Sequence, residues 1–278
     1  MKYKYTDGAI RFAAGTCFDP VKIFECGQCF RWNQDKGGYT GIAMNRRLRV
    51  QNEGGEISMD CAPWEFEEIW RDYFDMDTDY DHIRETVSID PYMKEAAEYG
   101  AGIRILRQDS WEALCSFIIS QCNNIPRIKG IVERLCRDFG EKKGTGEEVF
   151  YTFPRPGIIA RLREDDLTSI RAGFRASYII SAARAVDSGE LDLQALKKGS
   201  ADEALKALKG LNGVGDKVAG CVMLFGLYKT EAFPIDVWMK RAISRHYGAN
   251  FSPDIFGRYA GIAQQYMFYY ARSGERTA

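Results

Sequence analysis

The stretch from Leu211 to Asp236 constrains this chain more than any other, because it combines a glycine turn, an apolar helix and a returning loop. Gly213, Val214 and Gly215 form the turn, and the helix predicted over residues 217–226 follows directly. Such a turn leaves backbone N–H groups unpaired at the helix N-terminus, and these groups suit a phosphate. We therefore expect a hairpin that binds an anion.

A lone lysine, Lys217, lies in the first turn of this apolar helix. The positive end of the helix dipole and the loss of solvent both favour its neutral amine, which is a nucleophile. Asp236 follows nineteen residues later (236 minus 217), where it can assist proton transfer or stabilise positive charge. The spacing predicts a catalytic pair, although Asp236 can also act as the N-cap of a helix over residues 237–247.

Composition limits the class of protein. With 278 residues the chain is long enough for one large domain or two ordinary ones, and 45% hydrophobic and 28% charged residues are typical of a globular protein. No apolar run approaches the ~20 residues that span a bilayer, and the N-terminus lacks the apolar core of a signal peptide. We expect an intracellular protein with no membrane partner.

The cysteines and the net charge narrow the choice further. The eight cysteines include one close pair, Cys26 and Cys29, and only two histidines accompany them, so a zinc or redox site is the less favoured interpretation. The net charge of −1 argues against an indiscriminate binder of polyanions. It leaves open a DNA enzyme that holds a few phosphates with backbone amides and well-placed basic side chains.

The hydrophobic pattern predicts an α+β protein in two regions, 1–105 and 106–278, with the hairpin at 211–215. The first region should contain an antiparallel sheet with flanking helices, and the second should be helical throughout. The expected strands are 24–26, 30–32, 39–43, 47–50 and 57–59. The expected helices begin at Pro63 and Asp90 and then cover 111–122, 126–139, 157–163, 164–169, 174–188, 191–196, 201–209, 217–226, 237–247 and 259–272, with a loop over 140–152.

The stretch LNGVGDKVAGCVMLFGLYKTEAFPIDVWMKR resembles the helix–hairpin–helix, loop and aspartate of the HhH-GPD DNA glycosylase superfamily. Within it, the chain is most similar to the bifunctional, lysine-carrying 8-oxoguanine DNA glycosylases. Residues 27–32, GQCFRW, resemble that family's N-terminal motif, and residues 173–178 and 259–268 resemble its later segments. The resemblance covers nearly the whole chain. It implies a TBP-like sheet followed by an HhH-GPD helical bundle.

The resemblance also implies a reaction. Lys217 attacks C1′ of the damaged nucleoside, expels the base and leaves a Schiff base, which permits strand cleavage by β-elimination. Asp236 supports that step. The expected partner is double-stranded DNA containing oxidised guanine, with formamidopyrimidine as a further substrate. The enzyme should work as a monomer and require no cofactor.

Four residues correspond to the family's base pocket. The Gly27 carbonyl would accept the N7–H of the oxidised guanine, and Gln264 would read its Watson–Crick edge. Cys221 and Phe268 would enclose the extruded base between sulfur and a ring. From the residues alone, Gly27 can equally be a turn glycine, Gln264 an exposed helical residue, and the other two part of a helical core.

A second group corresponds to the residues that fill the vacated space and hold the orphaned cytosine. Asn123, Asn124, Arg127 and Arg175 would supply hydrogen bonds, and Phe174 would wedge beside the estranged base. The alternative for the segment 122–127 is an ordinary helix-to-helix loop with polar capping residues.

Three positions depart from the family pattern. Cys122 stands where an asparagine that touches the orphan cytosine is common, and a thiol donates hydrogen bonds poorly. Discrimination for cytosine should therefore be weaker, though not lost. Phe174 replaces a common tyrosine, and Trp238 replaces a histidine common in eukaryotic members. We expect Trp238 to touch DNA or the neighbouring pocket.

The hairpin can also hold an ion. Its backbone carbonyls, those of Leu211 and Val214, could bind Na⁺, K⁺, Ca²⁺ or Mg²⁺. Two other functions compete with the one above. An endonuclease III-like glycosylase typically carries a four-cysteine iron–sulfur loop, and no cysteine follows Cys221, so no such cluster is expected. A non-catalytic helix–hairpin–helix DNA-binding protein would have no use for a buried Lys217.

Overall fold

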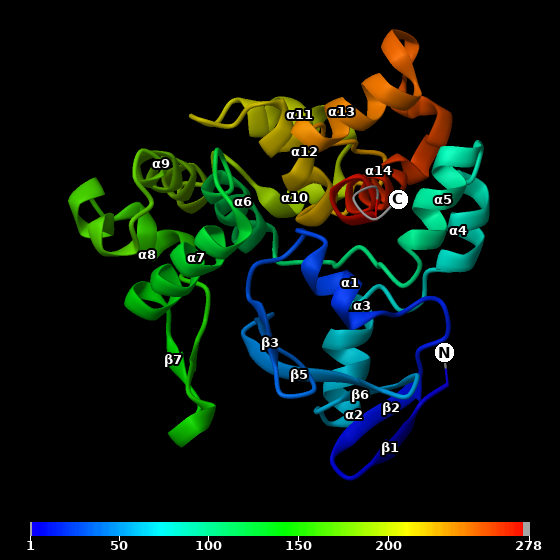
Figure 1. The fold of residues 1–278 in the computed structure, drawn as a ribbon. Coiled ribbons are helices and arrows are strands. Elements are labelled where there is room, and N and C mark those ends of the chain that lie inside the picture. Colours follow the sequence, from blue (N-terminus) through cyan, green and yellow to red (C-terminus); the bar gives the residue numbers. More distant parts are fainter. Residues whose placement is uncertain (1, 275–278) are drawn as a thin grey trace.

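The computed structural model describes residues 2–274, and its N-terminal part is a six-stranded antiparallel sheet (Figure 1). The strands lie in the order β1-β2-β6-β5-β4-β3. The predicted antiparallel sheet is confirmed, but the sequence pattern missed its first two strands and placed the next one too early, at 30–32. The strands are β1 (Lys4–Thr6), β2 (Ala9–Ala13), β3 (Trp32–Asp35), β4 (Gly38–Ala43), β5 (Arg46–Glu53) and β6 (Glu56–Met59).

The strand predicted over residues 24–26 is wrong, because this segment belongs to helix α1 (Pro20–Glu25). The Asp19 carboxylate accepts the Val21 N–H at 2.9 Å, which caps the helix N-terminus. This local start signal outweighs the β propensity of Phe24. The Phe24 side chain is still buried against the sheet, where its ring stacks on Trp32 with centroids 4.0 Å apart.

A run of short helices packs on the sheet and encloses its hydrophobic core. The helix predicted from Pro63 exists as α2 (Pro63–Glu65), a π-helical turn η1 (Phe66–Trp70) and α3 (Arg71–Tyr73). Phe66, Trp70 and Tyr73 of this run are buried with the aromatic side chains of the strands, whereas Trp64 is exposed. At Gly41 a Cβ would lie 2.1 Å from the Trp32 ring, so only glycine permits this packing.

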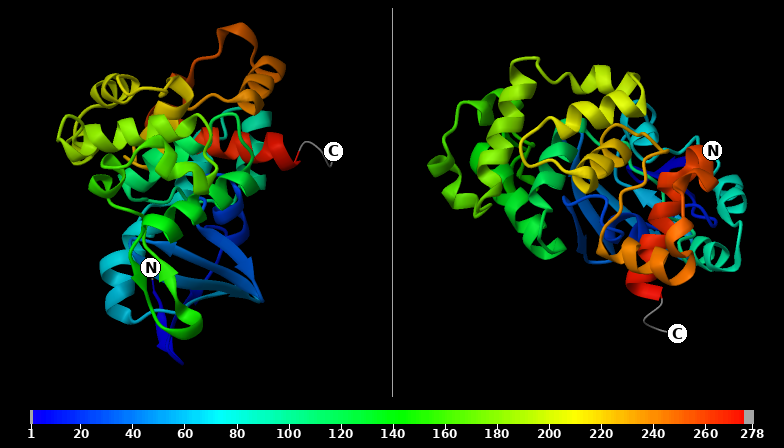
Figure 2. Two further views of the ribbon diagram at one scale, coloured as in Figure 1. Left: turned by 90° about the vertical axis from the view of Figure 1, so that its left-hand side faces the viewer. Right: turned by 90° about the horizontal axis from the view of Figure 1, so that it is seen from above.

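The rest of the chain is almost entirely helical, and its helices lie on one side of the sheet (Figure 2). The pattern missed α4 but found the other long helices. Asp79, Asp90 and Asp109 are the N-caps of α4, α5 and α6. The helices are α4 (Tyr80–Val87), α5 (Pro91–Tyr99), α6 (Ser110–Ile119), α7 (Ile125–Phe139), α8 (Pro156–Ala160), η3 (Glu164–Ile170), α9 (Arg175–Asp187), α10 (Leu193–Lys198), α11 (Ala201–Lys209), α12 (Asp216–Phe225), α13 (Val237–His246), η4 (Gly248–Asn250), η5 (Pro253–Tyr259), α14 (Ala260–Tyr269) and η6 (Tyr270–Gly274).

The segment 140–152 is more ordered than the predicted loop. It forms a small hairpin of β7 (Lys142–Lys143) and β8 (Phe150–Tyr151), joined through the 3-10 turn η2 (Gly146–Glu148). Paired strands of two residues are too short to produce a detectable alternation. The hairpin extends beside the sheet (Figure 1), and the Arg31 guanidinium donates to the carbonyl of Tyr151.

The α+β class is therefore confirmed, while the boundary near residue 105 stays a prediction. One hydrophobic core lies inside the sheet region, but the larger core joins Cys26 and Phe30 of the first region to helices that extend to Ala271. The segment that follows α1 is thus part of the hydrophobic core of the helical region. Within residues 2–274, no helix has both the length and the apolar character needed to cross a membrane.

Candidate active site

The glycine turn has the expected helix–hairpin–helix geometry, with α11 before it and α12 after it. Gly213 has a φ of 77°, and a Cβ there would lie 2.2 Å from the Tyr178 ring, so this position requires glycine. Gly215 is the N-cap of α12, and no side chain of the described residues caps that helix. A Cβ at Gly215 would meet nothing within 4 Å. The first N–H groups of α12 are thus open to an anion.

The carbonyls of the turn are compatible with a cation. The Leu211 carbonyl accepts the Val214 N–H at 3.2 Å, which uses one of its two lone pairs. Backbone carbonyls are suitable ligands for hard cations, and the turn is compatible with an ion at Leu211 and Val214. The ion itself stays a prediction. Across residues 2–274, no cluster of three or more His, Cys, Asp or Glu side chains could hold a metal ion.

Lys217 lies in the first turn of α12 and is half-buried against the end of α6. Its Nζ donates to the Ser120 hydroxyl at 3.2 Å and lies 5.7 Å from the centroid of the Phe117 ring. Cys221 follows one turn later on α12. Burial raises the pKa of the Cys221 thiol, so this group is a neutral, polarisable surface beside the amine.

Asp236 reaches the same place by way of the loop that leaves α12. A Cβ at Gly220 would lie 3.2 Å from Pro234, so a small residue lets the loop cross α12 closely. The Asp236 carboxylate accepts the Met239 N–H at 2.9 Å and caps α13, which confirms the capping role expected from the sequence. The cap fixes the orientation of a carboxylate that also lines the pocket of Lys217.

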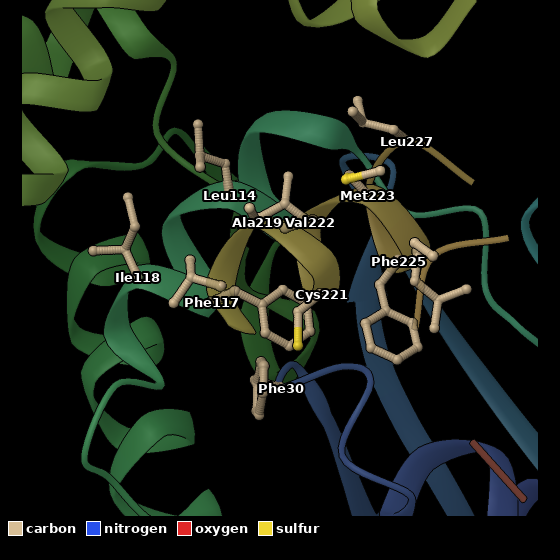
Figure 3. Packing of buried hydrophobic residues seen from close by; sticks show 14 of the residues in the cluster. Phe30, Leu114, Phe117, Ile118, Ala219, Cys221, Val222, Met223, Phe225 and Leu227 are labelled. Atoms are coloured by element: carbon tan, nitrogen blue, oxygen red, sulfur yellow. The ribbon is translucent and has the colours of Figure 1, made fainter. Parts of the chain in front are cut away.

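Lys217 and Asp236 share one pocket of about 60 Å³ with all four predicted base-recognition residues, Gly27, Cys221, Gln264 and Phe268. The sequence did not indicate five further lining residues. Of these, Phe117 of α6 lies beside Cys221 of α12 in the core (Figure 3), and its ring stacks on Phe225 at 5.3 Å. Only the apolar character of Phe117 and Phe225 was visible in the sequence. The five are Cys26, Phe117, Phe225, Pro234 and Gln265.

Helix α14 supplies the polar edge of the pocket. A Cβ at Gly261 would lie 2.6 Å from the Ala232 carbonyl, so glycine allows α14 to pack closely on the loop before Asp236. Gln264 is 4% exposed, and its Oε1 has no hydrogen-bond partner among the described residues. A buried acceptor without a partner costs about 1–3 kcal/mol, and a ligand that donates a hydrogen bond removes that cost. The exposed helical glutamine considered above is therefore wrong.

Gly27 lies on the opposite wall, in the segment between α1 and β3. Its φ of 84° belongs to the left-handed region that favours glycine. A Cβ there would lie 3.5 Å from the Phe268 ring and 3.6 Å from the Arg272 guanidinium. Gly27 and Phe268 thus face each other across a narrow space, in which the backbone can approach a ligand.

The segment 122–127 leaves α6 and begins α7, and its asparagines bind their own backbone. The Asn124 side chain accepts the Arg127 N–H at 3.0 Å, so it is the N-cap of α7. The Asn123 amide donates to the Ile119 carbonyl at 3.1 Å. Cys122 is exposed and has a φ of 47°. These contacts are those of a helix-to-helix loop with polar capping residues, the alternative stated for this segment.

Arg175 is buried and donates to the carbonyls of Gln121, Cys122 and Ala172. Its guanidinium lies 4.4 Å from the centroid of the Phe174 ring, and Phe174 is 54% exposed. Trp238, near the start of α13, is half-buried, with Arg241 5.5 Å from its ring. No member of this second predicted group lines the pocket of Lys217.

Comparison with known families divides the chain into two matched parts. Residues 10–114 match the family described as 8-oxoguanine DNA glycosylase, N-terminal domain. Residues 115–255 match the family described as HhH-GPD superfamily base excision DNA repair protein.

Individual proteins that are similar to this chain point to the same family. The chain is 33% identical to an N-glycosylase/DNA lyase of Saccharomyces cerevisiae, covering 89% of this chain and 72% of that one. It is 30% identical to an N-glycosylase/DNA lyase of Arabidopsis thaliana, covering 91% and 77%. A solved structure of Clostridium acetobutylicum 8-oxoguanine glycosylase/lyase, in complex with double-stranded DNA containing cytosine opposite 8-oxoguanine, superimposes with a TM-score of 0.91. It is 36% identical and covers 99% of both chains.

Proposed function

Because the chain belongs to the HhH-GPD superfamily of base excision DNA repair proteins, and within it to the 8-oxoguanine DNA glycosylases, we propose that it excises 8-oxoguanine from duplex DNA and then cleaves the strand. It is a DNA N-glycosylase with lyase activity at the abasic site. The observation that carries this proposal is the shared pocket, in which the only lysine lies beside an aspartate and the four predicted base-recognition residues.

The lysine performs both steps of the reaction. Lys217 Nζ forms a bond to C1′ while the bond from C1′ to the base breaks, and the base leaves with the electron pair. Asp236, fixed by its cap on α13, stabilises the positive charge that develops on the sugar. Loss of the ring oxygen from C1′ gives the Schiff base with Lys217. Removal of a 2′ proton then expels the 3′ phosphate by β-elimination.

The walls of the pocket account for the choice of base. 8-Oxoguanine carries a hydrogen at N7 that guanine lacks, and the Gly27 carbonyl is the acceptor for it. The unpaired Oε1 of Gln264 accepts from the Watson–Crick edge of the extruded base. Cys221 and Phe268 contact its two faces. Formamidopyrimidine retains the corresponding N–H and is a second substrate of the same pocket.

The remaining surface binds the duplex. The open N-terminus of α12 takes one phosphate through Gly213, Val214 and Gly215, and a cation on the hairpin carbonyls would reinforce it. Phe174 fills the space left by the extruded base, and the neighbouring loop meets the orphaned cytosine. The chemistry requires no cofactor, since Lys217 is the nucleophile. The protein acts as a monomer inside the cell, where genomic DNA lies in the nucleoid or nucleus.

Borohydride trapping tests the proposal. A duplex with 8-oxoguanine opposite cytosine should give a covalent protein–DNA adduct on reduction, and Lys217→Gln should abolish it. A panel of lesions and opposite bases in the same assay separates an 8-oxoguanine enzyme from an endonuclease III-like enzyme. Absence of any adduct would contradict the lysine mechanism and favour a non-catalytic DNA-binding protein. An adduct that survives Lys217→Gln would contradict the role of Lys217 and assign the attack to another amine of the protein.

A further inference from the structure

We propose that Gln265 and Arg272, two side chains of the C-terminal helices, are positioning residues that hold the Gly27 carbonyl at the pocket wall. They thereby set the selectivity for a base with a hydrogen at N7. This inference rests on the proposed function, because it concerns how the same pocket tells 8-oxoguanine from guanine. Neither side chain is needed as a donor to the substrate itself.

The observation concerns four consecutive carbonyls, those of residues 25–28. Three of them accept a hydrogen bond from a distant side chain. Arg272 donates to the Glu25 carbonyl, Gln265 donates to the Cys26 carbonyl at 2.8 Å, and Gln108 donates to the Gln28 carbonyl at 2.7 Å. Among the hydrogen bonds of the described residues, none reaches the carbonyl of Gly27, which lines the pocket.

Gly27 needs such contacts because, among the bonds of the described residues, its own backbone makes no hydrogen bond. Gly27 lies between α1 and β3, outside any helix or strand, and glycine rotates more freely than any other residue. Gln265 is 2% exposed, so its bond to the Cys26 carbonyl is made away from water and holds the peptide directly before Gly27. Losing it would leave the Cys26 carbonyl buried without a partner.

The same helix also carries the residues on the other side of the base. Gln264 precedes Gln265 in α14, and Phe268 follows one turn later, with the Arg272 guanidinium 5.3 Å from its ring centroid. One rigid element therefore fixes both the reader of the Watson–Crick edge and the acceptor for N7–H. The distance between those two groups is what a guanine-sized base has to match.

The test uses Gln265→Leu, which keeps the volume and removes the donor, and Arg272→Leu. Binding of duplexes with 8-oxoguanine or guanine opposite cytosine is measured in a Lys217→Gln background, where no base is released. We expect each variant to lower the preference for 8-oxoguanine over guanine about tenfold, since small misplacements of a recognition group cost this much or more. Arg272→Lys keeps a donor and should restore most of the preference.

Two controls separate positioning from general stability. Lys22→Met removes two comparable side-chain bonds, to the carbonyls of Tyr99 and Ala101, without touching residues 25–28. It should lower Tm while leaving the preference for 8-oxoguanine unchanged. Strand cleavage at a preformed abasic site, measured with Lys217 intact, should stay within twofold for Gln265→Leu and Arg272→Leu, because that step involves no base.

The outcomes are distinguishable. If the unmodified protein shows no preference for 8-oxoguanine, the proposed function fails. If it shows the preference and both leucine variants retain it, the positioning inference is wrong while the function stands. Parallel losses of abasic-site cleavage and base preference would also overturn the inference, because they indicate a merely structural role.

Discussion

The base pocket around Lys217 and the loop of residues 122–127, which is expected to meet the opposite base, differ in what their polar groups already bind. In the pocket, Gln264 Oε1 is buried without a partner and the Gly27 carbonyl accepts no hydrogen bond from the described residues. In the loop, Asn123 and Asn124 contact neighbouring backbone groups, and Arg175 of α9 donates to the carbonyls beside them. The pocket offers unpaired acceptors to a ligand, whereas these three side chains already bind the protein's own backbone.

This difference predicts unequal costs of recognition. A base that enters the pocket gains hydrogen bonds without breaking any of those within the protein, so the lesion is read by a preformed site. The orphaned cytosine has to compete with the carbonyls of Gln121, Cys122 and Ala172 for the Arg175 guanidinium. The selectivity for the lesion should therefore be high, and the selectivity for the opposite base should be lower.

Asp236 provides the largest test, because it separates chemistry from architecture within the pocket. Asn caps helices as well as Asp, so Asp236→Asn should leave Tm unchanged. It removes the charge beside the sugar, and we expect single-turnover excision to fall about 1000-fold. Quench-flow or gel-based rates at saturating enzyme measure this fall.

The matched variant Asp236→Ala loses the cap as well as the charge. Its excision rate should equal that of Asp236→Asn, while the free energy of unfolding falls by about 1 kcal/mol. A normal rate in Asp236→Asn would mean that the carboxylate is only a helix cap.

The second test addresses the loop. Arg175→Met keeps the length of the side chain but leaves three carbonyls without their donor. We expect the free energy of unfolding to fall by about 2–3 kcal/mol, with most of the preference for cytosine lost. Urea denaturation and excision opposite the four bases measure the two effects. A stable variant with altered preference would show instead that Arg175 acts on cytosine and not on the loop.

The fold was predictable where the pattern is long and local. The helix of residues 201–209 was predicted to the residue, because capping by Ser200 and amphipathic spacing agree. The strand at 24–26 failed because the start signal at Asp19 lies outside the window that its apolar residues define. The strands of the β7–β8 hairpin have only two residues each, so they leave no periodic trace.

The part of the site that depends on local sequence was also predictable. Lys217 and Asp236 stand out because a lysine in an apolar turn and an aspartate at a helix start are locally unusual. Gln265 does not, since a glutamine in an apolar helix carries no sign that it reaches a carbonyl 239 residues away in the chain. Contacts of this kind arise from tertiary packing alone.

The third test uses the buried pair that links the two regions. Arg31 belongs to the segment of Gly27, and Glu112 belongs to α6, which leads into the loop; their charged groups lie 3.6 Å apart. Burial raises the pKa of Glu112 from 4.5 to about 7, despite the neighbouring Arg31. The folded state thus binds the proton more tightly, so the free energy of unfolding falls as pH rises from about 4.5 to about 7.

Glu112→Gln removes this titration and keeps the shape. Relative to the unmodified protein, the variant should gain about 1–2 kcal/mol of stability between pH 5 and pH 8. Urea midpoints at both pH values measure the difference. An equal pH dependence in the two proteins would show that Glu112 titrates normally and that the link between the regions is a strong ion pair.

The smallest effect is expected at Cys122, the exposed residue of the loop. Its φ of 47° is more comfortable for asparagine than for cysteine, so Cys122→Asn should not destabilise the protein. Asparagine adds a donor and an acceptor at this exposed position of the loop, and we expect the preference for cytosine to rise about threefold. Excision of 8-oxoguanine opposite the four bases measures it, with Cys122→Ser, a smaller polar residue, as the matched control. Unchanged ratios in Cys122→Asn would mean that the loop's internal bonds, and not the identity of this side chain, limit the selectivity.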